Sequence, residues 1–101
     1  MSTLLYSHPV CLEHDPGTMH PECPARLEAV LDGLNDDRFG SLKRCEAPEI
    51  DLGLVEMVHK PYYVEKVVRS APDEGRVSLD PDTLMSSESL EAVRRASGAA
   101  V

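Results

Sequence analysis

The apolar residues of this chain recur mainly at helical spacing. Between residues 27 and 34, four apolar side chains follow the pattern i, i+3, i+4, i+7, which places one apolar stripe along a helix. Pro24 suits the first turn of that helix, where its missing N–H costs no hydrogen bond. A polar Asn-Asp-Asp run at 35–37 follows the stripe. The pattern therefore predicts a helix that begins at Pro24 and ends in this polar run.

Three further helices are predicted downstream. Asp51 is a suitable N-cap for a short helix, and Pro61 begins another helix with valines on one side. Ser86 or Ser87 caps a last helix that continues to the final residue without a C-terminal cap, a basic residue or a breaker. Small residues fill positions 96–100, so we expect this helix to pack closely against another element.

Strand signals are few. The run Thr3–Tyr6 is short and apolar, which predicts one buried strand. Residues 76–84 read as extended chain or loop because Pro81 interrupts them. A lone strand would leave backbone groups unsatisfied. We therefore expect a segment of a larger α/β domain, itself mostly α-helical with one or two short strands.

Composition and charge narrow the classes of partner. The 101 residues are 42% hydrophobic and 28% charged, as in ordinary globular proteins. One Phe, three Tyr and no Trp make a weak core for a chain that folds alone. The net charge of -8 argues against nucleic acid and anionic membranes, which would repel the chain. A cationic substrate stays compatible with it.

The three cysteines bear on the compartment. Their number is odd, no secretory signal precedes them, and no apolar run approaches the ~20 residues needed to span a bilayer. We therefore predict that the thiols are reduced and that the protein is cytoplasmic.

The segment from His14 to Leu27 gathers two histidines, two carboxylates and an arginine around the start of a helix. One hypothesis is a structural pin, in which Arg26 ties down the preceding loop and Glu22 is its ion-pair partner. A second is a structural zinc, because the ligand types of zinc occur here as Cys-x2-His-x5-His-x2-Cys. That site would consist of Cys11, His14, His20 and Cys23.

Three motifs in order resemble the class II-like histone deacetylases and acetylpolyamine amidohydrolases. They are His-Pro-Glu-Cys-Pro-Ala-Arg at 20–26, Val-His-Lys-Pro-Tyr-Tyr-Val at 58–64, and Asp-Pro-Asp-Thr at 80–83 before a helix rich in Ala and Gly. The resemblance implies an arginase/deacetylase-type three-layer α/β domain, of which residues 1–101 form the N-terminal, incomplete part.

The same resemblance implies roles for individual residues. Asp82 matches a rim aspartate that accepts hydrogen bonds from backbone amides of a peptide substrate, although Asp also serves turns by bonding its own backbone. His20 and Pro21 lie in the first rim loop, which shapes the entrance for the substrate. Arg26 matches an arginine that lines the internal channel beneath the active site.

The family's zinc ligands are absent from the sequence. The resemblance implies one catalytic zinc held by an Asp-x-His pair and a second Asp, with tandem histidines as the base, but this chain has no Asp-x-His and no His-His. We expect zinc in the complete domain, no cofactor and no catalytic residue in this chain, and no activity from it alone.

The function predicted from the sequence is therefore structural support for a deacetylase. The chain would supply the substrate-rim loops and outer helices of a domain that hydrolyses acetyl-lysine or acetylpolyamine amides. Its partner would be the remainder of that domain, or a second copy when isolated. The alternatives are a non-catalytic helical protein-interaction module, which requires a complete hydrophobic core, and a small zinc-loop domain.

Overall fold

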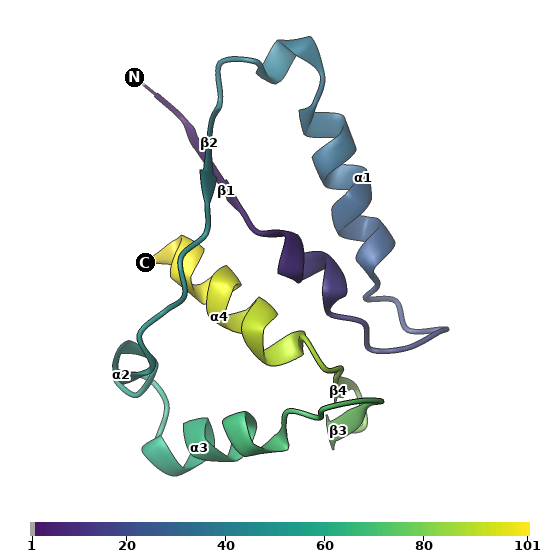
Figure 1. Cartoon of the computed structure of the whole chain (residues 1–101), viewed down its shortest axis with the longest axis vertical. Coiled ribbons are helices and arrows are strands. Elements are labelled where there is room, and N and C mark those ends of the chain that lie inside the picture. The colour runs from purple at the N-terminus through teal and green to yellow at the C-terminus, as the bar shows by residue number, and fades with distance from the viewer. Residues whose placement is uncertain (1) are drawn as a thin grey trace.

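The computed structural model describes residues 2–101, and the chain winds around its own C-terminal helix, α4 (Figure 1). The strands are short and lie in two separate pairs. In chain order the elements are β1 (Leu4–Ser7), the 3-10 helix η1 (Pro9–Glu13), α1 (Pro24–Leu34), the 3-10 helix η2 (Asp37–Phe39), β2 (Lys43–Glu46), α2 (Leu52–Val55), α3 (Pro61–Ser70), β3 (Val77–Asp80), β4 (Thr83–Met85) and α4 (Ser89–Ala100).

The helix starts follow the sequence signals at three positions. Helix α1 begins at Pro24 and α3 begins at Pro61, each with proline in its first turn. The Oδ1 atom of Asp51 accepts a hydrogen bond from the N–H of Gly53 at 2.9 Å and so caps α2. Within residues 2–101, no helix has both the length and the apolar character that a membrane crossing requires.

The predicted cap of the last helix is wrong. Helix α4 begins at Ser89 rather than after Ser86 or Ser87, and its N-cap residue, Glu88, makes no side-chain cap bond. The Ser86 hydroxyl instead accepts a hydrogen bond from the N–H of Asp15 at 3.0 Å and lies 3.2 Å from the carbonyl oxygen of Glu13. A distant loop therefore takes the hydroxyl that the sequence assigned to a local cap.

The predicted strand at the N-terminus forms and has a partner, but it is not buried within residues 2–101, because Leu4 is 48% and Tyr6 41% exposed. Strand β1 pairs in parallel with β2, with Leu4 opposite Lys43 and Ser7 opposite Glu46. The sequence Lys-Arg-Cys-Glu of β2 lacks the alternation of apolar and polar residues that marks a half-buried strand. No local pattern therefore predicts this pairing.

The segment 76–84, predicted as extended chain or loop, forms a hairpin. Strands β3 and β4 pair antiparallel, with Val77 opposite Met85, and Pro81 and Asp82 form the turn between them. Proline fits a turn because its φ angle is fixed and no ladder hydrogen bond is needed there. Residues 2–101 thus contain four short strands where one or two were predicted.

Small residues let α4 pack closely against the chain between β2 and α2. A side-chain carbon at Gly98 would overlap the carbonyl oxygen of Pro48. The N–H of Ile50 donates to the carbonyl oxygen of Arg94 at 3.0 Å, and Arg95 Nη1 donates to the carbonyl oxygen of Ala47 at 3.0 Å. The close packing predicted for residues 96–100 is confirmed at Gly98.

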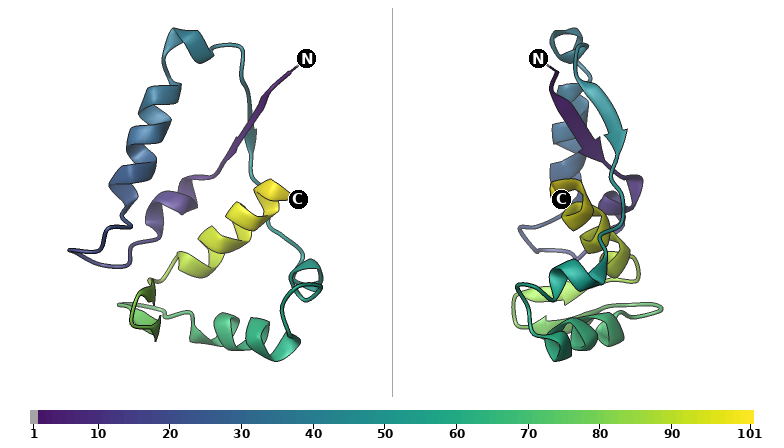
Figure 2. Two further views of the ribbon diagram at one scale, coloured as in Figure 1. Left: turned by 180° about the vertical axis from the view of Figure 1, so that it is seen from behind. Right: turned by 90° about the vertical axis from the view of Figure 1, so that its left-hand side faces the viewer.

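The hydrophobic core is small for a chain of this length. The accessible surface is 7274 Å², whereas a compact monomer of this mass exposes about 5,700 Å². The radius of gyration is 15.2 Å against about 13 Å for a compact domain, and Figure 2 shows the molecule thin in one direction. Among residues 2–101 the core is therefore not the complete one that the alternative of an interaction module requires. The buried apolar residues are Ala47, Ile50, Val64, Met85 and Ala92.

Candidate functional site

A loop between η1 and α1, residues 14–22, lies against the β3–β4 hairpin and the start of α4. We call this segment the rim loop. Its tip carries Met19, whose side chain is fully exposed and whose φ angle is 69°. A positive φ is uncommon for a residue other than glycine, and such strain persists only where surrounding contacts fix the backbone. Contacts of His14, Asp15 and His20 hold the loop backbone on both sides of Met19.

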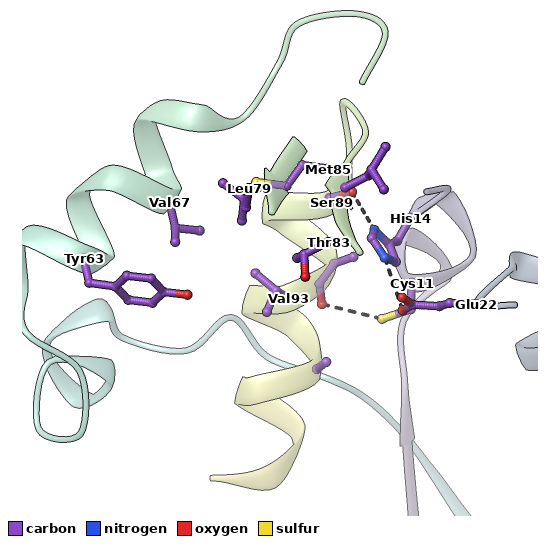
Figure 3. Close-up of a pocket in the computed structure, with 13 residues that line it drawn as sticks. Cys11, His14, Glu22, Tyr63, Val67, Leu79, Thr83, Met85, Ser89 and Val93 are labelled. Atoms are coloured by element: carbon purple, nitrogen blue, oxygen red, sulfur yellow. Dashed lines mark hydrogen bonds and ion pairs between the residues drawn. The ribbon is translucent and has the colours of Figure 1, made fainter. Parts of the chain in front are cut away.

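His14 links the rim loop to α4. Its Nδ1 atom lies 2.6 Å from the hydroxyl of Ser89, and its Nε2 atom lies 3.3 Å from Oε1 of Glu22 (Figure 3). Glu22 therefore faces His14 and not Arg26, so the predicted ion pair between Glu22 and Arg26 does not form. The side chain of Arg26 makes no hydrogen bond or salt bridge within residues 2–101 and is exposed on α1.

Asp15 links the rim loop to the chain that precedes β3. Arg76 donates from Nε to the carbonyl oxygen of Asp15 at 2.9 Å and from Nη2 to Oδ2 at 3.1 Å. The other carboxylate oxygen accepts the N–H of Gly17 at 3.0 Å, and Gly17 has a φ of 117° that glycine tolerates. The N–H of Gly17, and then Arg76, lower the pKa of Asp15.

His20 links the rim loop to the hairpin turn. Its Nε2 atom lies 3.2 Å from the carbonyl oxygen of Asp82 and 3.3 Å from the carboxylate oxygen Oδ1 of the same residue. Its Nδ1 atom accepts the N–H of Glu22 at 3.0 Å. The structure thus brings together His20 and Asp82, two residues predicted at the substrate entrance. Pro21, the third residue predicted there, follows His20 directly in the chain and is exposed.

A carboxylate holds the turn itself. Oδ1 of Asp80 accepts the N–H of Asp82 at 2.8 Å, and Oδ2 accepts the Thr83 hydroxyl at 3.0 Å. These bonds stabilise the charged form, so the N–H of Asp82 and then the Thr83 hydroxyl lower the pKa of Asp80. Asp80 therefore takes the role of bonding the turn backbone, and the side chain of Asp82 is 91% exposed.

A cavity of about 410 Å³ opens between the rim loop, the hairpin, α3 and α4 (Figure 3). Most of its wall is apolar, with Val67 from α3, Leu79 and Met85 from the hairpin, and Val93 from α4. Cys11 also faces it, and burial raises the pKa of that thiol. A raised pKa reduces the fraction of reactive thiolate, so this wall offers no activated nucleophile at Cys11.

The four residues of the hypothetical structural zinc site have other partners or lie apart. The Cys11 thiol faces the carbonyl oxygen of Ala92 at 3.8 Å, while His14 and His20 hold the contacts described above. Cys23 is the N-cap residue of α1. Within the part of the chain that the structure describes, no three His, Cys, Asp or Glu side chains form a group suited to a metal ion. These residues do not fit a zinc site, and all three cysteines are free.

Sequence reasoning did not find the anchors of the rim loop. Arg76, Ser86 and Ser89 lie more than sixty positions from the loop residues that they bind, and no local pattern indicates such a contact. One signal was available, because Asp-Pro-Gly at 15–17 is typical of a turn in which Asp bonds the N–H two residues ahead.

Comparisons with known proteins agree on one family. The histone deacetylase domain matches residues 20–101. An uncharacterized protein of Synechocystis sp. is 32% identical over 101 residues, which cover 95% of this chain and 32% of that protein. Polyamine deacetylase HDAC10 of Rattus norvegicus is 45% identical over 53 residues, which cover 48% of this chain and 8% of that protein.

A solved structure extends the likeness to the fold. The crystal structure of the HDA15 HD domain matches with a TM-score of 0.88 at 27% identity, over 98% of this chain and 30% of that chain. The chain thus spans about a third of the length of the Synechocystis protein and of the HDA15 HD domain.

Proposed function

Because the chain belongs to the histone deacetylase family, we propose that it forms the substrate entrance and outer helices of a deacetylase domain. That domain hydrolyses acetyl-lysine or acetylpolyamine amides. The observation that carries the proposal is the contact between His20 and Asp82, which joins the rim loop to the hairpin turn. Two segments that the family resemblance places at the entrance meet there, within a fold matched at a TM-score of 0.88.

Asp82 is the residue that binds the backbone of a peptide substrate in this proposal. A carboxylate accepts several hydrogen bonds, and bonds to a charged acceptor are stronger than bonds between neutral groups. Its side chain is 91% exposed, and Asp80 supplies the bond that the turn needs. The carboxylate of Asp82 is therefore open to amide donors of a bound substrate. His20 and Pro21 shape the same edge.

Arg26 lines the internal channel in this proposal. Its position on the first turns of α1 and its exposed side chain, without a hydrogen bond or salt bridge to residues 2–101, support that role. A guanidinium carries a permanent charge and five donors, which suits a wall that guides acetate outward.

Zinc and the catalytic groups belong to other parts of the complete domain. The chain has no Asp-x-His and no His-His, and its described residues do not fit a metal site. We therefore assign no catalytic residue here and expect no activity from these 101 residues alone.

The partner of the chain is the remainder of the deacetylase domain. The excess accessible surface, about 1,600 Å² over a compact monomer, is about twice the roughly 800 Å² that one partner contributes to a standard protein interface. The match to 30% of the HDA15 HD domain chain supports a large covering partner. The net charge of -8 disfavours nucleic acid and anionic membranes, and three free thiols support a cytoplasmic location.

Kinetics of the full-length gene product test this proposal. We expect zinc-dependent hydrolysis of an acetyl-lysine peptide or an acetylpolyamine. The variant Asp82→Asn should raise KM for the peptide about ten-fold with kcat little changed, because it weakens hydrogen bonds present in both ground and transition state. Asp37→Asn, which removes the same charge from η2, should leave KM unchanged. Absence of amide hydrolysis contradicts the deacetylase assignment, and an unchanged KM in Asp82→Asn removes Asp82 from substrate binding.

A further inference from the structure

The imidazole of His20 joins the rim loop to the hairpin turn, because one ring nitrogen bonds within the loop and the other faces the turn. Nδ1 of His20 accepts the backbone N–H of Glu22 at 3.0 Å, while Nε2 faces two oxygens of Asp82 at 3.2 and 3.3 Å. The His20 side chain is 15% exposed, whereas that of Asp82 is 91% exposed. A largely buried ring therefore lies beneath an exposed carboxylate.

The backbone bond determines the tautomer of this ring. A backbone N–H can only donate, so Nδ1 must present its lone pair to Glu22. The ring proton of the neutral form then resides on Nε2, where it points to the carbonyl and carboxylate oxygens of Asp82. The other tautomer would place two donors face to face at Glu22 and two acceptors face to face at Asp82.

We propose that His20 is a positioning residue, which holds the carboxylate of Asp82 in the orientation that receives the substrate. This inference rests on the proposed role of Asp82 in substrate binding. An exposed Asp samples several rotamers, and binding through it costs the entropy of fixing one of them. The proton on Nε2 bonds the carbonyl oxygen of Asp82 at 3.2 Å, and Oδ1 lies 3.3 Å from the same nitrogen. The ring therefore holds the backbone that carries the carboxylate and faces one of its two oxygens, which leaves most of its lone pairs for substrate amides.

The chain contains a second copy of the same arrangement away from the rim. Nδ1 of His8 accepts the N–H of Val10 at 3.0 Å, and its Nε2 atom lies 3.3 Å from Oε1 of Glu46 on β2. The exposed fractions are similar, 17% for the His8 side chain and 73% for that of Glu46. His8 is therefore a matched control for the local effect of replacing a histidine of this kind.

Replacing His20 by asparagine separates the two contacts of the ring, the bond to the Glu22 N–H and the donor that faces Asp82. At Asp15, Asp36 and Asp51, an Oδ1 atom accepts the N–H of the residue two positions ahead at 2.9–3.0 Å. The Oδ1 atom of an asparagine at position 20 can make the same bond to Glu22. The variant His20→Asn thus keeps the local turn and loses the donor that reaches Asp82.

Kinetics of the full-length protein with an acetyl-lysine peptide test the inference. We expect His20→Asn to raise KM about three- to ten-fold, as the loss of one hydrogen bond would, with kcat little changed. His8→Asn should leave KM unchanged. In the double variant with Asp82→Asn, KM should equal that of Asp82→Asn alone, because His20 acts through Asp82.

The outcomes distinguish the two proposals. If Asp82→Asn does not change KM, the role of Asp82 in substrate binding is wrong. If Asp82→Asn raises KM while His20→Asn does not, or if the two effects multiply, the positioning role of His20 is wrong and the role of Asp82 stands.

Ring ¹⁵N chemical shifts supply a readout that does not depend on activity. In the full-length protein we expect the Nε2-protonated tautomer at His20, with the Glu22 amide signal retained in His20→Asn. A proton on Nδ1 in the wild-type protein would overturn the inference whatever the kinetics show.

Discussion

At the scale of single residues, Gly98 holds the tightest approach between α4 and the preceding chain. A side-chain carbon there would overlap the carbonyl oxygen of Pro48 and lie 3.0 Å from the Ile50 nitrogen. Backbone atoms cannot move aside as a flexible side chain can. We expect Gly98→Ala to destabilise the full-length protein by about 1–3 kcal/mol, measured as a lower Tm.

The matched control for this prediction is Gly33→Ala in α1. A side-chain carbon at Gly33 meets nothing within 4 Å, so the change should only remove the helix cost of glycine and stabilise by about 0.5–1 kcal/mol. Equal effects of the two substitutions would show that the close approach at Gly98 is not present in solution.

Asp15 makes the rim loop sensitive to acid. The N–H of Gly17, followed by Arg76, lowers the pKa of Asp15 below its ordinary value of 3.8. A carboxyl group with a lowered pKa in the folded state contributes stability above its ordinary pKa, and the contribution is lost as pH falls through the lowered value. Asp15→Asn should therefore reduce the Tm at neutral pH and have no effect at a pH below the lowered pKa.

Thermal unfolding of both proteins across this pH range checks the prediction. The difference in Tm between wild type and Asp15→Asn should be constant at neutral pH and should shrink only below about pH 4. A difference that persists unchanged into strong acid would assign the effect to packing rather than to the charge of Asp15.

At the scale of elements, α4 lies at the centre of the described structure, and α3 lies at the edge of the molecule (Figure 1). Helix α4 packs on η1 and β1 and receives the backbone bond from Ile50, whereas α3 packs on no other element as extensively. Local opening requires less free energy where fewer apolar contacts are lost. In the isolated chain we expect backbone amides of α4 to exchange with solvent more slowly than those of α3. Equal protection in the two helices would contradict this order.

The elements also show how far the sequence predicts the fold. Prolines at 24 and 61 and the cap at Asp51 located three helices, because these signals act within one turn of the chain. Strand β2 was missed because its residues are mostly polar. The prediction of extended chain or loop for residues 76–84 did not specify the hairpin, because a turn and a break have the same local signature at Pro81. Strand β2 pairs with the distant strand β1, with Leu4 opposite Lys43, whereas the hairpin is a local pairing, with Val77 opposite Met85.

In the candidate site too, the sequence predicts individual residues but not the contacts between residues distant in the chain. Motifs selected His20 and Asp82 separately, and the family resemblance placed both at the entrance. Their contact spans 62 positions and could not be derived from either motif. The Arg26–Glu22 pair was wrong for a related reason, since proximity in sequence does not reveal that His14 competes for Glu22.

At the scale of the whole molecule, exposed apolar surface decides how the isolated chain behaves. Large apolar side chains such as Val58, Tyr62 and Val30 are 81%, 68% and 56% exposed. Surfaces of this kind associate when no partner covers them. We expect residues 1–101 alone to self-associate in size-exclusion chromatography with light scattering. A stable, well-folded monomer would show that the chain needs no covering partner.

The most direct test of the chain's role is an amide hydrolysis assay of residues 1–101 alone, with zinc added, beside the full-length gene product. Acetyl-lysine peptide and acetylpolyamine serve as substrates for both proteins. We expect hydrolysis by the full-length protein and no rate above buffer for the 101 residues, because they contain neither the Asp-x-His nor the His-His element. Zinc-dependent hydrolysis by the 101-residue chain would contradict its assignment as the entrance of a deacetylase.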